Sequence, residues 1–445
     1  MRAPGTLAAE GIVYLYRRCV EPELSHYTGV PRGPGGGPLL KTLQQLALCL
    51  AVWVAFSVGL SAQAPASAAH SDPLSFDPVV RDGYQHFYNL DYDSALARFD
   101  QVLKTHPQDP MALDYVLMAT IFRELYHQDL LDTTYYAHDS FLTSKRDVPV
   151  SREIRNRIES LTNDAINLCD QRIKANSNDK DAYFARGYAR GMHAAFITLV
   201  DHSFASAARQ GWQARSDSEQ VLKLDPDYAD AKMAMGIQQF AVASLPRFVR
   251  LMVGIFGVGG SKEKGLALLR EAAANGVVTS VESRTVLSLF LRHDARYPEA
   301  LVVAQGLSRE FPHNYLFRLE EANLLKDAGN GPAAIAAYKT ALADAQKKGY
   351  FIDPRLQLAW FGLADTQRGQ NDIRDAANAY LQAADLPNGS DWLRRRAELN
   401  AGQMLDLLHE RDQAAREYQL AAAGGGDQSQ ADAARRYLKA PYTGK

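Results

Sequence analysis

Two stretches of the chain, DYDSALARFDQVLKTHP at residues 91–107 and RYPEALVVAQGLSREFP at residues 296–312, repeat one pattern of side chains. The first stretch carries the pattern at Tyr92, Ala95, Phe99, Val102 and Pro107. The second has the same steps of three, four, three and five residues, at Tyr297, Ala300, Ala304, Leu307 and Pro312. Steps of three and four place the apolar positions on one stripe of a helix. Proline then ends the helix because it cannot continue one, so each stretch predicts the second helix of a helical hairpin.

The small residue on the stripe defines the repeat. Ala95 or Ala300 allows two helices to approach closely, and the next apolar residue fills the space beyond. The unit, about 34 residues long, resembles the tetratricopeptide repeat, whose signature has a small residue in the first helix and Ala, aromatic, Ala and Pro in the second. This resemblance implies an all-α, right-handed superhelical solenoid of about seven or eight helix-turn-helix repeats.

The pattern covers most of the chain after residue 75 but is uneven. It is clear in the first unit, 76–109, and in the last four, of which the unit with Ala376, Tyr380 and Ala383 matches best. Units two to four are atypical, and a helix over 427–439 is predicted to cap the stack. We divide the chain into an N-terminal extension with a signal segment at 1–68, repeats with insertions at 76–244, an apolar insertion at 245–264, and regular repeats with the capping helix at 265–440.

The N-terminal part contains an apolar run from Leu46 to Leu60. This run is shorter than the roughly 20 residues of a membrane-spanning helix but suits the apolar region of a secretory signal. Small residues follow at Ala62-Gln63-Ala64 and Ala66-Ser67-Ala68, a pattern typical of signal peptidase sites. We expect cleavage after Ala64 or Ala68 and export to the periplasm or envelope of a bacterium. The alternative is an inner-membrane anchor formed by 43–60.

Composition and motifs exclude several classes of function. The 49 Lys and Arg residues balance 51 Asp and Glu residues, so no positive field favours nucleic acid as a partner. The sequence has no nucleophile elbow, no HExxH and no paired cysteines. We therefore predict a protein that is not an enzyme and that has no cofactor and no metal site. Cys169 is expected to pack in the core.

The apolar insertion around 245–258 has two interpretations. Burial against neighbouring helices would remove apolar area from water. Alternatively, its arginine-edged apolar side chains could contact a membrane surface or an apolar partner. The residues of this candidate contact are Phe248, Leu251, Met252, Ile255 and Phe256.

The candidate binding surface is the groove lined by the first helices, which is the usual ligand surface of such solenoids. The resemblance places nine residues there: Tyr84, Phe87, Tyr188, Ile237, Asn323, Lys326, Asp365, Arg368 and Gln403. We expect a scaffold that binds a protein or peptide, held mainly by the aromatic N-terminal half, because aromatic side chains dominate binding hot spots. The alternative is a lipid- or small-molecule-handling protein, or an enzyme, whose site is built by the insertions at 132–150, 198–212 and 245–262.

Overall fold

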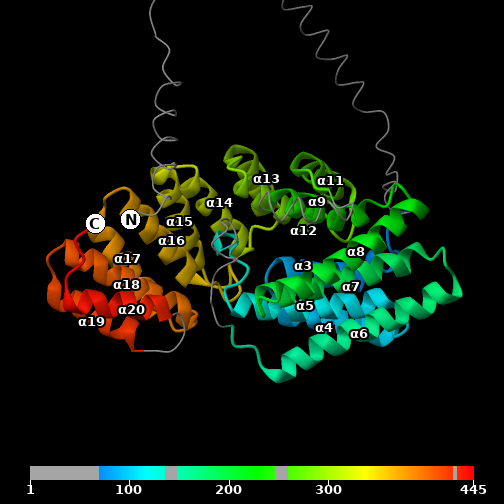
Figure 1. The fold of residues 1–445 in the computed structure, drawn as a ribbon, viewed down its shortest axis with the longest axis horizontal. Coiled ribbons are helices and arrows are strands. Elements are labelled where there is room, and N and C mark those ends of the chain that lie inside the picture. Colours follow the sequence, from blue (N-terminus) through cyan, green and yellow to red (C-terminus); the bar gives the residue numbers. More distant parts are fainter. Residues whose placement is uncertain (1–69, 136–147, 246–258, 424–427, 445) are drawn as a thin grey trace, which may run out of the picture. The chain divides into compact units, whose positions relative to one another are not determined.

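The computed structural model describes residues 70–135, 148–245, 259–423 and 428–444, which belong to one unit, Ala64–Lys445 (Figure 1). Within these ranges the chain forms helices joined by short turns, and no strand occurs. The prediction of an all-helical protein is thus confirmed. The signal segment, residues 136–147 and most of the apolar insertion lie outside the described residues, and so do Phe248, Leu251, Met252, Ile255 and Phe256.

The helices pack as successive hairpins, each against the next (Figure 1). The pairs are α3 (Pro78–Tyr88) with α4 (Tyr92–Thr105), α5 (Pro110–His127) with α6 (Arg152–Ala175), α7 (Lys180–Leu199) with α8 (Phe204–Leu224), α9 (Lys232–Ser244) with α11 (Lys262–Asn275), α12 (Ser280–His293) with α13 (Tyr297–Glu310), α14 (Tyr315–Asp327) with α15 (Gly331–Ala345), α16 (Leu356–Gly369) with α17 (Ile373–Asp385), and α18 (Asp391–Leu407) with α19 (Arg411–Ala422). Helix α20 (Gln428–Lys439) packs on α19, as predicted for the capping helix. Short 3-10 turns are η2 (Pro73–Phe76), η3 (Thr133–Tyr135) and η5 (Ala229–Ala231).

Polar side chains at the ends set where several helices begin. Asp77 accepts a hydrogen bond from the backbone N–H of Val79 at 2.7 Å at the start of α3. Asp109 accepts one from the N–H of Met111 at 3.0 Å at the start of α5. In both helices proline is the first residue, where its missing N–H would have no partner within the helix. Local sequence therefore fixes these boundaries.

Small residues lie where the two helices of a hairpin meet, as the repeat pattern predicts. A Cβ atom on Gly83 would lie 2.5 Å from a ring carbon of Phe99, and one on Gly402 would lie 2.6 Å from the ring of Tyr418. Both glycines precede their aromatic partner by the same interval of the repeat. Ala300 is fully buried, which agrees with its predicted place at a close helix contact.

The insertion predicted at 198–212 is mostly helical. Helix α7 continues to Leu199 and α8 begins at Phe204, so most of this segment lengthens the two helices. His202, with a φ of 50°, makes the tight turn between them. Extension of the helices satisfies the backbone hydrogen bonds that a loop would leave to water.

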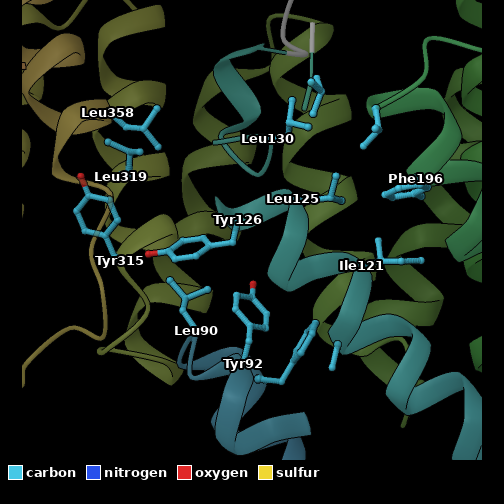
Figure 2. Packing of buried hydrophobic residues seen from close by; sticks show 14 of the residues in the cluster. Leu90, Tyr92, Ile121, Leu125, Tyr126, Leu130, Phe196, Tyr315, Leu319 and Leu358 are labelled. Carbon is cyan, nitrogen blue, oxygen red and sulfur yellow. The ribbon is translucent and has the colours of Figure 1, made fainter. Parts of the chain in front are cut away.

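The core runs directly from the early hairpins to the later ones. Tyr126 of α5 points toward Tyr315 of α14, with Leu90 and Tyr92 beside it (Figure 2). The Tyr126 hydroxyl donates a hydrogen bond to the backbone carbonyl of Asp353, 2.7 Å away. Helices α3 and α5 therefore pack on the region of α12 to α16, although many hairpins separate them in sequence.

A buried ion pair fixes this long-range contact. Arg355, just before α16, donates from Nε to Asp129 Oδ1 at 2.6 Å, and the two side chains are only 7% and 2% exposed. Arg355 also donates to the carbonyl of His127 at 3.1 Å. The second oxygen of Asp129 accepts the N–H of Ser390 at 3.1 Å. Because both charges are paired and hydrogen-bonded, their burial is tolerated.

Replacing Ala300 by Leu tests the close contact between α12 and α13. The added carbons have no free space, so Ala300→Leu should lower the free energy of unfolding by about 1–3 kcal/mol. Val302, on the same helix, is 66% exposed, and Val302→Leu should change stability by less than about 0.5 kcal/mol. Urea unfolding measures both, and an unchanged midpoint for Ala300→Leu would show that the assigned register is wrong.

A double-mutant cycle tests the long-range ion pair. Arg355→Met leaves the Asp129 carboxylate buried without its cation and should cost about 3–5 kcal/mol. Adding Asp129→Asn removes that charge but keeps an oxygen for the N–H of Ser390, so most of the loss should be recovered. Urea unfolding of Arg355→Met, Asp129→Asn and the double variant measures the three losses of stability. A loss in the double variant that equals the sum of the two single losses would contradict a coupled buried pair.

Candidate functional site

The segment after α5 is held by a buried arginine of α12. The side chain of Arg292 is 1% exposed and pairs with Glu320 at 3.1 Å and with Asp327 at 2.7 Å. It also donates hydrogen bonds to the hydroxyls of Thr133 at 2.7 Å and Thr134 at 3.1 Å. These contacts place η3 against α12 and α14.

A cavity of about 160 Å³ lies where α3 and this segment meet α12 to α14. Its walls are mainly aromatic and aliphatic, with a few polar groups. The lining residues are Phe87, Tyr88, Leu90, Tyr92, Phe122, Leu131, Asp132, Thr133, Val281, Glu282, Thr285, Val286, Ser288, Ala304, Leu307, Asn314, Leu316, Phe317, Leu319 and Glu320. An apolar pocket with a few convergent polar groups is the usual form of a small-molecule site.

Glu282 is the carboxylic acid of this cavity with the fewest hydrogen-bond partners. It is 9% exposed, and its Oε1 accepts a hydrogen bond from the Tyr88 hydroxyl at 2.8 Å. Its Oε2 atom is buried and has no hydrogen-bond partner. Burial raises the pKa of Glu282 to about 7, and the negative charge of Asp230 adds to the effect. The carboxyl group therefore changes its charge near neutral pH.

The other carboxylate groups of the cavity are better compensated. Glu320 faces the guanidinium of Arg292 and accepts a hydrogen bond from Thr133. Burial raises the pKa of Glu320, whereas the charge of Arg292 opposes that rise. Asp132 accepts hydrogen bonds from the side-chain amide of Asn323 at 3.1 Å and from the N–H of Thr134 at 3.0 Å.

The aromatic half of the predicted groove is covered. Phe87 is 4% exposed and Tyr188 is 5% exposed, and the Tyr188 hydroxyl donates to Met118 Sδ at 3.0 Å. Tyr84 is half-buried and packs against Phe99 and Tyr115. The structure corrects the expectation that Phe87 and Tyr188 face an open groove, because α3 packs against later hairpins and Tyr188 of α7 packs against α5. Phe87 instead lines the cavity.

The middle of the predicted groove is also mostly covered. Asn323 is 3% exposed, and it links Asp132 to the hydroxyl of Tyr338, which donates to Asn323 Oδ1 at 2.5 Å. Asn323 therefore stabilises the docked segment and does not face solvent. Ile237 is half-buried against the cluster around Leu269, and Lys326 is half-buried.

The C-terminal end of the predicted groove contains the most exposed of the predicted residues. Arg368 of α16 is 43% exposed and lies 3.4 Å from Asp365, one turn earlier. Asp365 is 20% exposed and accepts a hydrogen bond from Tyr380. Gln403 of α18 is half-buried. Arg368 is thus the exposed member of the predicted set, whereas Asp365 and Gln403 are half-buried, like Tyr84, Ile237 and Lys326.

A second cluster has the residue types of a metal site. His70, Asp225 and Asp227 place ligand atoms within 4.8 Å of one another. However, Asp225 already accepts hydrogen bonds from His70 at 2.8 Å and from the Lys180 ammonium at 2.5 Å. Although burial opposes it, these hydrogen bonds lower the pKa of Asp225. The Lys180 cation thus provides the positive charge that an ion would supply.

The residues that sequence reasoning missed are Glu282, Arg292 and Glu320. Tyr88 and Glu282 are 194 residues apart in the chain, so no motif spacing links them. The local signal is the presence of charged residues among the apolar positions of α12 and α14, and this signal is equally typical of a solvated helix face.

The buried acids predict how stability depends on pH. Burial, with the charges of Asp109 and Asp181, raises the pKa of Asp72 to about 7, as burial does for Glu282. Such groups bind a proton more tightly in the folded state than in the unfolded state. Their contribution to the stability of the folded state is therefore complete below about pH 4 and is lost as the pH rises through 7. The free energy of unfolding should be lower by at least about 1 kcal/mol at pH 8 than at pH 5.

Urea unfolding at the two pH values measures this difference. Glu282→Gln should reduce it, because the amide cannot ionise. Glu263 is an exposed carboxylate, so Glu263→Gln is the control. Its free energy of unfolding should differ between pH 5 and pH 8 by as much as that of the unchanged protein. A protein that is equally stable at both pH values would contradict the prediction.

No family model matches the chain, and no curated protein matches it. Among solved structures, yeast Tom70 is 12% identical with a TM-score of 0.38, over 81% of this chain and 94% of that one. Pseudomonas aeruginosa PilF is 15% identical with a TM-score of 0.38, over 58% of this chain and 99% of that one. A tetratricopeptide repeat protein from Parabacteroides merdae is 12% identical with a TM-score of 0.33, over 73% of this chain and 98% of that one.

No helix in the described ranges is both long enough and apolar enough to cross a membrane. The chain's own packing, with Gly83 against Phe99 and Gly402 against Tyr418 in successive helical hairpins, is that of a tetratricopeptide-type helical solenoid.

Proposed function

We propose that this protein is a non-enzymatic, exported scaffold that holds a protein or peptide on the first helices of its C-terminal hairpins. The observation that carries the proposal is that Arg368 is exposed beside the half-buried Asp365 and Gln403 on α16 and α18, whereas Phe87 and Tyr188 are buried. Helical solenoids bind partners through such faces.

The chemistry of this face favours a polar peptide segment. Within two adjacent first helices it offers a carboxylate, a guanidinium and an amide, which can pair with charges and backbone groups of an extended chain. The overall balance of 49 basic and 51 acidic residues gives no reason to propose nucleic acid. A peripheral membrane contact through 245–258 remains a proposal from the sequence.

Export is supported by the apolar run and the small-residue sites before residue 69. The first described residues are part of the fold: Ser71 is buried and donates a hydrogen bond to Asp230 at 2.8 Å. Cleavage after Ala64 or Ala68 would retain these contacts. An uncleaved anchor at 43–60 would leave the same fold attached to the membrane.

The proposal is tested by identifying a partner and then measuring its affinity. Pull-down from an envelope fraction followed by mass spectrometry supplies the partner. Arg368→Glu should then weaken binding about tenfold or more, which corresponds to about 1.4 kcal/mol. The matched control is Arg435→Glu, because Arg435 is also exposed and also pairs with an acid three residues earlier.

The melting temperature of each variant shows whether the fold is retained. Binding that is reduced equally by Arg368→Glu and Arg435→Glu would argue against this face. Recovery of no protein partner would contradict the scaffold function itself.

A further inference from the structure

The cavity between α3 and α12 to α14 has the size of a small ring compound. Its volume is about 160 Å³, close to the ~150 Å³ of an apolar cavity that binds benzene in another protein. Aromatic rings from separate elements form much of its wall, among them Phe87 and Tyr88 of α3, Phe122 of α5 and Phe317 of α14. Aromatic faces attract cations as well as apolar groups.

The charge of the lining is one-sided. The cavity is lined by three acidic residues, Asp132, Glu282 and Glu320. None of the described residues that line it is Lys, Arg or His. Asp132 and Glu320 have partners from the surrounding helices. Arg284, which is on the same helix as Glu282, pairs with Glu310 instead. Glu282 therefore has no ion-pair partner among the described residues.

The Oε2 atom of Glu282 lacks a hydrogen-bond donor that a ligand could supply. Glu282 is more than nine-tenths buried, and its Oε2 atom accepts no hydrogen bond. A buried acceptor without a donor costs free energy, and a ligand that brings an N–H group to this atom would recover it. A positively charged ligand would also form an ion pair with the ionised Glu282 carboxylate.

We propose that this cavity binds a small organic amine with an apolar, ring-sized body, whose ammonium group pairs with Glu282. The apolar body fills the space between the aromatic walls, and Tyr88 orients the carboxylate through its hydroxyl. This site is separate from the accessible face on α16 and α18, so neither proposal depends on the other.

Binding of a cation to Glu282 must depend on pH. The groups that face this carboxyl group electrostatically are Tyr84 and Tyr88 of α3, Tyr188 of α7, Asp230 of η5 and Arg284 of its own helix. Because the pKa of Glu282 is raised to about 7, most of the carboxyl groups are protonated at pH 6 and ionised at pH 8. An amine that stays protonated over this range should bind about tenfold more tightly at pH 8.

Calorimetric titration of the full chain with benzylamine and benzyl alcohol tests the proposal. The two probes have nearly the same shape and both donate hydrogen bonds, but only the amine is charged. Benzylamine should bind at least tenfold more tightly than benzyl alcohol at pH 8, and this preference should shrink at pH 6.

Glu282→Gln is the decisive variant because it keeps the side-chain shape and the acceptor for Tyr88. It should abolish the preference for benzylamine and leave the affinity for benzyl alcohol unchanged. Glu263→Gln, which removes an exposed carboxylate outside the lining, should change neither affinity. Circular dichroism verifies that both variants are folded.

Three results would overturn the proposal. One is equal affinity for the two probes in the unchanged protein, and another is benzylamine affinity that survives Glu282→Gln. The third is the absence of measurable binding by either probe at millimolar concentration.

Discussion

The docking of the first hairpins on the later ones is the constraint on which the rest of this structure depends. A solenoid whose hairpins touch only their neighbours would leave the first helices α3 and α5 open along one face. Here the pair of Arg355 and Asp129, with the Tyr126 hydroxyl on the carbonyl of Asp353, joins the end of α5 to residues more than two hundred positions later. The hydrogen bond from Tyr88 to Glu282 joins α3 to α12. The contact replaces an open aromatic face with a continuous core.

The same docking creates the cavity and its acid. Tyr88 comes from α3 and Glu282 from α12, and each loses water when the two helices meet. One hydrogen bond compensates one carboxylate oxygen and leaves the other without a donor. Burial of this kind is what raises the pKa of a carboxyl group. On the hairpins beyond the docked segment Arg368 is exposed, so the mainly apolar cavity and this polar face lie on different hairpins.

Much of the fold could be predicted from the sequence because the repeat is a local device. Ala300 indicates a close contact between two helices, and Pro312 indicates the end of a helix. Both features depend only on residues of the same hairpin. The insertion at 198–212 was harder, because a longer helix and a loop can contain the same residues. Helix propensity alone does not decide between them.

The candidate site could be predicted only in part, for a physical reason. An aromatic residue such as Tyr188 suits both a ligand groove and a helix interface, and only long-range packing decides between the two. Asp365 and Arg368 lie on α16, the first helix of its hairpin, and this position depends only on the register of one repeat. The pairing of Tyr88 with Glu282 depends on how hairpins far apart in sequence approach each other, which no spacing encodes.

Hydrogen exchange of the peptide that covers residues 125–134 tests the central claim most directly, because this segment makes the long-range contact. If α5 and the following turn are docked as described, its amide hydrogens should exchange slowly, at rates like those of α14. Rapid exchange of this peptide while α14 and α16 stay protected would contradict the account, since it would mean that the first hairpins are not held against the later ones.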